Sequence, residues 1–182
     1  MIFYDLEIIQ YKIELRIFEH NLRNFDLDLF VKQFDNDSSS YIKEASFYRI
    51  IANNLISIIS TWEQQLFRFC NNYIEETENN FNLIRNKYLN FGIDEKLFDS
   101  IKEYRYVNNV LKHGKASTSF TKLQKLRSKF INPNKKYKNL NDDNFNMPIL
   151  NIDENSIYEL CKQIETFWTK INDHMMKKNK HL

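Results

Sequence analysis

A short run near the middle of the chain combines the residue types that acid–base chemistry on a phosphate requires. Arg105, Asn109 and His113 follow one another at intervals of four, with Lys112 directly before the histidine and Gly114 directly after it. On a helix this spacing puts the first three residues on one broad face. Histidine is the usual carrier of a proton near neutral pH, whereas arginine and lysine bind phosphate oxygens.

This combination suits the cleavage of RNA without a metal ion. A base removes the proton of a ribose 2′-hydroxyl, the oxygen attacks the adjacent phosphorus, and cations stabilise the charge that develops. We expect His113 to move the proton and Asn109 to orient the imidazole or the substrate. Arg105 and Lys112 would hold the phosphate. The ordinary alternative is a capped helix end, in which Gly114 stops the helix and the polar side chains are merely solvated.

The distance between Arg105 and His113 bears on how such a site is built. The two residues are about 12 Å apart along a helix axis. Helical side chains lean toward the N-terminus, so Arg105 leans away from His113. Two copies of this helix, packed antiparallel across a twofold axis, would bring Arg105 of one chain toward His113 of the other. The spacing therefore predicts a homodimer with a shared site.

The same region carries basic residues and no acidic ones. The segment from Tyr104 to Asn141 contains no Asp or Glu, although the net charge of the whole chain is only +2. Such a segment suits an anionic ligand, and a solvated lysine-rich surface is the alternative. Candidate contacts to RNA or phosphate are Lys112, Lys115, Lys122 and Lys125, with Tyr106 as a side chain that either stacks on a base or packs at a helix interface.

Composition excludes several other classes of protein. Cys70 and Cys161 each fall within an apolar helical pattern and have no metal-ligand spacing, so we expect buried free thiols and no metal. A glycine-rich phosphate loop is absent from the sequence, and nothing points to a cofactor. The sequence has no run of about 18 apolar residues and no signal-peptide pattern, so we expect a cytoplasmic protein without a membrane partner.

The elements that must position these residues read as helices. Two glycines and two prolines among 182 residues favour long helices with few turns. Apolar spacing predicts helices at about 2–33, 40–78, 82–92, 94–113, 117–131 and 153–176. A basic loop at 131–147 and a frayed tail at 176–182 complete one domain, 1–182. The expected fold is all-α, an up-and-down bundle of five to six helices with a long second helix.

Individual residues fix the expected faces and ends of these helices. Ile9, Ile13 and Ile17 belong to one apolar face of the first helix. Trp62 and Trp168 are expected in the core. Glu63, beside Trp62, either reaches the motif from a neighbouring helix or stands as a surface charge. The expected helix ends are Gly92 and Gly114 as stops, Asp94 as an N-cap, and Ser117 or Ser119 as the N-cap of the following helix.

The motif R-x-x-x-N-x-x-K-H-G, formed by Arg105, Asn109, Lys112, His113 and Gly114, resembles the motif helix of the HEPN superfamily. Members are small all-α proteins, many of them ribonucleases in bacterial toxin–antitoxin, abortive-infection and CRISPR-linked defence. "IISTWEQQLFRFCNNY" (58–73) is similar to the helix that precedes the motif in several such families. "SFTKLQKLRSKF" and "NMPILNIDENSIYELCKQIETFWTKI" are similar to the segments on its C-terminal side, so the resemblance covers roughly 45–172.

The resemblance implies a HEPN-like bundle and a function. Arg105 and His113 would be the catalytic pair and Asn109 the accessory polar residue, at the interface of a homodimer. The implied activity is a metal-independent endoribonuclease of a bacterial antiphage defence or toxin–antitoxin system, with RNA and an antitoxin or defence-system protein as partners. The alternative is a catalytically silent HEPN-like module that binds RNA or protein, or a structural subunit of a larger defence complex.

Overall fold

The computed structural model of the chain describes residues 3–24, 39–74, 80–114, 116–131 and 150–179. Those residues form six α-helices and no strand, so the prediction of an all-α bundle is confirmed. The helices are α1 (Phe3–Asn24), α3 (Ser39–Phe69), α4 (Phe81–Asn90), α5 (Glu95–His113), α6 (Thr118–Lys125) and α7 (Glu154–Asn179). The predicted basic loop lies, from residue 132 on, outside the described residues, as does Lys115.

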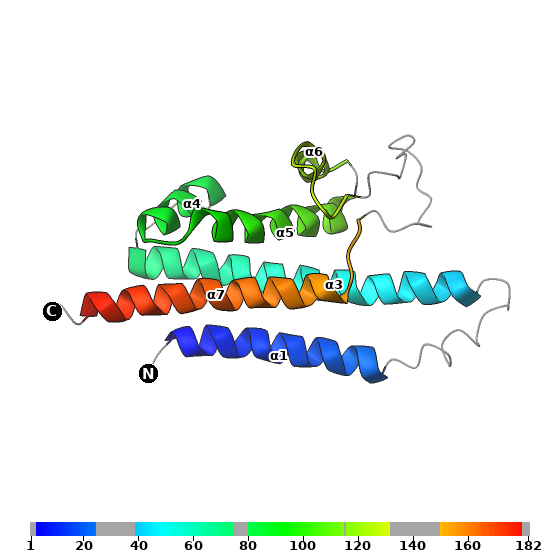
Figure 1. Ribbon diagram of the computed structural model, residues 1–182, viewed down its shortest axis with the longest axis horizontal. Helices are drawn as coiled ribbons and strands as arrows, with labels where there is room; N and C mark the ends of the chain where they lie inside the picture. Colours follow the sequence, from blue (N-terminus) through cyan, green and yellow to red (C-terminus); the bar gives the residue numbers. More distant parts are fainter. Residues whose placement is uncertain (1–2, 25–38, 75–79, 115, 132–149, 180–182) are drawn as a thin grey trace.

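The four long helices run alternately in opposite directions along the molecule (Figure 1). α1 packs against α3 and α7, and α5 packs against α3 and α7 from the other side. The short helix α4 lies near the start of α5, and α6 crosses close to its end. α5, which carries the motif, is therefore in contact with four helices, α3, α4, α6 and α7, while α1 is on the opposite side of the bundle.

Aromatic side chains fill the centre of the bundle, as predicted for the two tryptophans. Trp62 is fully buried and makes edge-on contacts with Phe98 and Phe167 at centroid distances of 5.9 and 5.8 Å. Trp168, also fully buried, packs edge-on against Phe69 at 5.7 Å. Burial of each such ring stabilises the fold by roughly 1.5–3 kcal/mol. These contacts join α3, α5 and α7 and so set the position of the motif helix relative to α3.

Both cysteines are buried free thiols, as predicted. Burial raises the pKa of the Cys161 thiol to about 12, and the nearby carboxylates of Glu14 and Glu165 act in the same direction. Because the thiolate is the reactive form of cysteine, this residue is inert at neutral pH and serves the core.

The second helix ends in a different form from the one expected. The pattern predicts one helix to about residue 78, but α3 passes at Cys70 into a π-helical stretch, Cys70–Ile74. The Tyr88 hydroxyl donates to the carbonyl oxygen of Leu66 at 2.9 Å. That carbonyl is the one that the backbone N–H of Cys70 would use in an α-helix. The π-helical stretch therefore begins where the Tyr88 hydroxyl bonds a backbone carbonyl that an α-helix would use for its own hydrogen bond.

The ends of the motif helix follow the sequence signals. Asp94 is the N-cap of α5, and its side chain accepts a hydrogen bond from the Leu97 N–H at 2.9 Å. Gly92 follows α4 with a φ of 98°, in the left-handed region that favours glycine. Ser117 is the N-cap of α6, the first of the two serines considered. These cap predictions are confirmed because each depends only on its immediate neighbours.

Two helix ends differ from the predicted bounds. α6 stops at Lys125 and not at residue 131. Arg127 takes a φ of 50°, and the Ser128 N–H bonds the Leu123 carbonyl at 3.0 Å, which is the closing bond of a Schellman motif. α7 continues through Asn179 where a frayed tail from 176 was expected. Residues 180–182 of that tail lie outside the described part of the chain.

The apolar face that the sequence predicts for the first helix does not face the core. Ile9, Ile13 and Ile17 are 48%, 53% and 47% exposed. The side that meets the core carries Phe18, fully buried, and Leu15, partly buried. α1 has apolar residues on more than one side, and the periodicity does not tell which side the neighbouring helices cover. A row of isoleucines is therefore left at the surface.

Candidate functional site

His113 is the last residue of α5 and is exposed. Gly114 ends the helix with a φ of 71°, and its N–H bonds the Val110 carbonyl at 2.7 Å. A Cβ atom at Gly114 would meet nothing within 4 Å, so the backbone angle, and not a lack of space, is what favours glycine there. Within the described ranges the imidazole has no hydrogen-bond partner. The histidine is thus open to solvent at a fixed helix end.

Arg105, about two turns before the end of α5, turns toward α3 and α4. Its Nε donates to the carboxylate of Glu63 on α3, and its guanidinium lies 4.2 Å from the centre of the Phe81 ring. The side chains of Arg105 and Glu63 are 27% and 20% exposed. The first of the two readings of Glu63 is therefore the one observed, since the residue reaches the motif from the neighbouring helix.

Lys112 reaches the same neighbouring helix two turns after Arg105. Its Nζ donates to the hydroxyl of Ser60 at 2.9 Å, and the side chain is exposed. Ser60 and Glu63 are three residues apart on α3, so they lie on one side of that helix. The line along which α3 and α5 meet thus carries two cations of the motif, Arg105 and Lys112.

Asn109 faces a different neighbour from Arg105. Its side-chain amide donates to the hydroxyl of the buried Ser119 on α6 at 3.3 Å. The residues Arg105, Asn109 and His113 follow the helix face as expected, but their side chains have separate surroundings: α3 and α4, then α6, then solvent. Asn109 bonds neither Arg105 nor His113, and its observed contact holds α6 against the motif helix.

The remaining candidate RNA contacts lie on and beside α6. Lys122 sits over the ring of Tyr106 at 5.2 Å, and Tyr106 is half-buried. Lys125 is exposed at the end of α6. Lys115 lies outside the described residues. Tyr106 thus has a cation on one face, an arrangement that favours packing at the surface of the helix pair over an open stacking platform.

Two neighbours of the motif are buried. Tyr104 is 2% exposed, and its hydroxyl donates to Glu159 at 2.9 Å. Burial first, and then the carboxylate, raise the pKa of this phenol. Asn108 is 1% exposed, and neither atom of its amide has a hydrogen-bond partner among the described residues. Neither side chain is open to a ligand at the surface.

Sequence reasoning did not identify Ser60, Phe81 or Ser119 as neighbours of the motif. Each belongs to a different helix, and Ser60 is 52 residues away from Lys112 along the chain. The one signal that pointed in this direction was the position of Glu63 next to a core tryptophan, because a residue that follows a buried one lies near the edge of the interface.

Two classes of site find no support in the described part of the chain. Those residues contain no group of three His, Cys, Asp or Glu side chains placed to hold a metal ion. None of the described helices is both long enough and apolar enough to cross a bilayer.

In comparisons with protein-family models, curated proteins and solved structures, nothing matches this chain.

Proposed function

We propose that the protein is a metal-independent endoribonuclease of the HEPN type, acting in the cytoplasm in bacterial antiphage defence or as a toxin. The observation that carries the proposal is an exposed His113 at the end of α5, on the same helix as two cations, Arg105 and Lys112. The resemblance of the motif to that superfamily supplies the reaction class. RNA is the proposed substrate because its 2′-hydroxyl is the nucleophile that such a site can use.

The proposed reaction needs one proton carrier and a cationic surface. His113 takes the proton of the 2′-hydroxyl, and the 2′-oxygen forms a bond to the adjacent phosphorus. The bond from phosphorus to the 5′-oxygen breaks, and that oxygen takes a proton from water, after which His113 releases its own proton to the solvent. The products are a 2′,3′-cyclic phosphate and a 5′-hydroxyl end. Arg105 and Lys112 stabilise the charge on the phosphoryl oxygens.

The contacts of Arg105 are compatible with this role. Glu63 binds the guanidinium through Nε, and an arginine has four further N–H donors on its two terminal nitrogens. Within the residues that the structure describes, no hydrogen bond from those terminal nitrogens is found. Glu63 and Phe81 therefore orient the fork and leave its outer edge to a phosphate.

The activity is tested with a single-stranded RNA oligonucleotide in the presence of EDTA. His113→Ala should slow cleavage by about 100-fold or more, the usual contribution of a general base. Lys96→Ala, an exposed cation at the other end of α5, serves as the matched control and should cleave normally. An RNA with 2′-deoxyribose at the cleaved position should resist. Undiminished cleavage by a folded His113→Ala protein contradicts the proposal.

The shared site is tested with two inactive variants. If each site takes Arg105 from one chain and His113 from the other, Arg105→Ala and His113→Ala chains will complement each other. An equal mixture forms heterodimers with one intact site, and about a quarter of the wild-type activity should return. No recovery after mixing, or a monomer by light scattering at micromolar concentration, contradicts the shared site but leaves the reaction open.

A second candidate function rests on the contacts of Arg105. An arginine that is paired with Glu63 and packed on Phe81 also suits a structural role. In that case the protein is a catalytically silent helical module that binds RNA or a protein partner. The wild-type protein would then bind the oligonucleotide, or a partner, without cleaving it, and expression would not arrest growth.

A further inference from the structure

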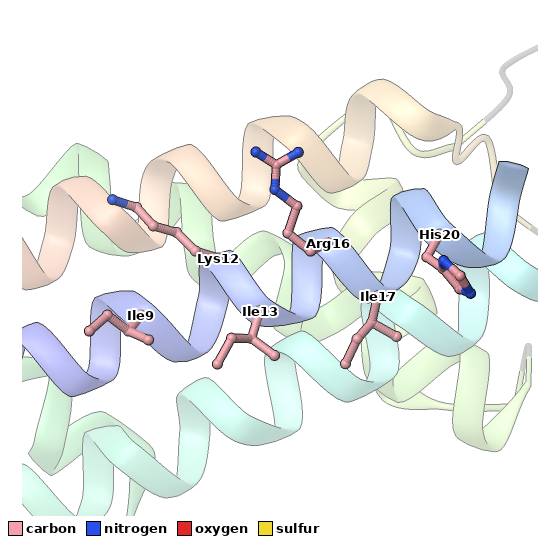
Figure 2. A pocket seen from close by; sticks show the side chains of 6 residues that line it. All are labelled: Ile9, Lys12, Ile13, Arg16, Ile17 and His20. Carbon is pink, nitrogen blue, oxygen red and sulfur yellow. The ribbon is translucent and has the colours of Figure 1, made fainter.

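The outer side of α1 carries an apolar row that the bundle does not cover. Ile9, Ile13 and Ile17 line a shallow groove together with Lys12, Arg16 and His20. Figure 2 shows the three isoleucines in a row along one edge of α1, while Lys12 and Arg16 extend from the other edge. The row is distinct from the residues of α1 that meet the core, Leu15 and Phe18. Contiguous exposed apolar surface of this kind marks an interaction site.

The spacing of the row suits a helix as the partner. Isoleucines at i, i+4 and i+8 form one of the ridges that pack into the grooves of a second helix. The ridge is about 12 Å long, so a partner helix of about three turns covers it. Isoleucine is stiff at its first side-chain torsion, so ordering these side chains on binding costs little entropy.

The charge around the row indicates that its partner is acidic. Every charged or titratable side chain that lines the groove is basic: Lys12, Arg16 and His20. Lys12 pairs with Glu165 and Arg16 pairs with Glu19, with the two cations 64% and 80% exposed. Exposed ion pairs contribute little, so both cations can exchange to carboxylates of a partner.

Two other occupants fit the groove less well. An anionic membrane is disfavoured because α1 as a whole carries four acidic and three basic residues. A second copy packed antiparallel would place Lys12 and Arg16 against the same cationic edge of its twin. Packed parallel, it would need the edge with Gln10 and Glu14, which instead meets Gln65 and Ser57 of α3.

We propose that this groove docks an amphipathic helix of another protein, with aliphatic side chains at spacings of three and four and with Asp or Glu along its flanks. The proposal does not rest on the ribonuclease function. α1 lies on the side of the bundle opposite α5 and α6, with α3 and α7 between them (Figure 1).

The test uses two synthetic helical peptides and the full chain. The peptides share one leucine row and differ in their flanks, which are all Glu or all Lys. By fluorescence anisotropy, the Glu peptide should bind the wild type at least about tenfold more tightly than the Lys peptide. Exchanging both cations, Lys12→Glu with Arg16→Glu, should reverse this preference, because carboxylates beside the row then match the Lys peptide and repel the Glu peptide.

Further variants locate the binding. Ile13→Asn should weaken binding of the Glu peptide at least about tenfold, because it removes the central aliphatic side chain that the peptide would cover. Leu83→Asn changes an aliphatic residue of α4 that is similarly exposed, at 47%, and should leave binding unchanged. Ile13 and Leu83 are both exposed, so both variants should fold, which circular dichroism checks. Ile13→Asn should also leave RNA cleavage unchanged.

Several outcomes would overturn the proposal. One is equal binding of both peptides, or of neither. Another is an equal effect of Leu83→Asn and Ile13→Asn. Self-association that Ile13→Asn abolishes would assign the groove to a second copy. Binding to vesicles of phosphatidylcholine and phosphatidylserine that Ile13→Asn abolishes would assign it to a membrane. Loss of RNA cleavage in His113→Ala alone bears only on the proposed function.

Discussion

At the scale of single residues, Arg105 combines an ion pair with a contact to an aromatic ring. Its Nε donates to Glu63 and its guanidinium lies 4.2 Å from the centre of the Phe81 ring, while no hydrogen bond from its terminal nitrogens is found within the described residues. An arginine suits this arrangement better than a lysine, because a lysine has a single charged nitrogen and no planar fork. The pair with Glu63 is mostly shielded from solvent, so we expect it to contribute to stability.

A double-mutant cycle measures this contribution. Arg105→Met and Glu63→Gln each remove one charge and keep most of the side-chain volume. Each single variant should lose about 1–2 kcal/mol of unfolding free energy in urea, since it leaves one partner without its ion pair. The double variant should lose less than the sum, with a coupling energy of about 1 kcal/mol. Strict additivity of the two losses would show that the pair contributes nothing.

The sequence predicted the residues of the motif but, among their partners, only Glu63, as one of two alternatives. The positions of Arg105, Asn109 and His113 on α5 follow from the period of one helix. The partners of Arg105 and Lys112 are 42 and 52 residues away along the chain. They meet only because aromatic side chains such as Trp62 and Phe98 fix α3 against α5. The apolar spacing within either helix does not predict how the two helices align with each other.

At the scale of the elements, helix ends were predictable where one residue decides them. The predicted caps and stops act on the chain within a few residues, and all four are observed at the predicted positions: Gly92, Asp94, Gly114 and Ser117. The end of α6 was missed because Arg127 takes the left-handed conformation that glycine usually provides. The face of α1 was missed for another reason: which of its apolar sides is buried depends on α3 and α7.

Arg127 gives a prediction about the end of α6. A residue other than glycine in the left-handed region destabilises the folded state by about 1 kcal/mol. Glycine avoids this strain but loses more conformational entropy on folding, which offsets part of the gain. Arg127→Gly should therefore raise the unfolding free energy by about 0.5 kcal/mol, seen as a higher midpoint in urea. Arg127→Ala is the matched control, because it removes the same charge but keeps the Cβ atom. If both variants have the same stability, backbone strain at this position is not the cause.

At the scale of the whole molecule, charge pairs join separate helices. Arg85 on α4 bonds Asp99 on α5 through two hydrogen bonds of 2.8 Å. Lys129, which follows α6, bonds Glu159 on α7, and Glu159 also accepts from Tyr104. These pairs connect α4 to α5 and the chain after α6 to α7, and so they surround the motif helix. Their carboxylates must be ionised for the pairs to form.

The stability of the molecule should therefore fall in acid. The hydrogen bond from Arg85 lowers the pKa of Asp99. Those from Lys129 and then Tyr104 lower the pKa of Glu159. Both groups bind protons more weakly in the folded state than in the unfolded one, so their stabilising effect is complete above the ordinary carboxyl pKa of about 4. It is lost as the pH falls through the lower pKa values of the folded state.

Urea denaturation from about pH 6 to about pH 3 measures this effect. The wild-type midpoint should decrease over the lower part of that range. A protein with Asp99→Asn and Glu159→Gln should start with a lower midpoint at the upper end and lose less of it in acid, because the two groups that release their stabilisation are absent. If the two proteins lose stability in parallel, other carboxylates cause the acid sensitivity, and the pairs around α5 do not hold the motif helix in place.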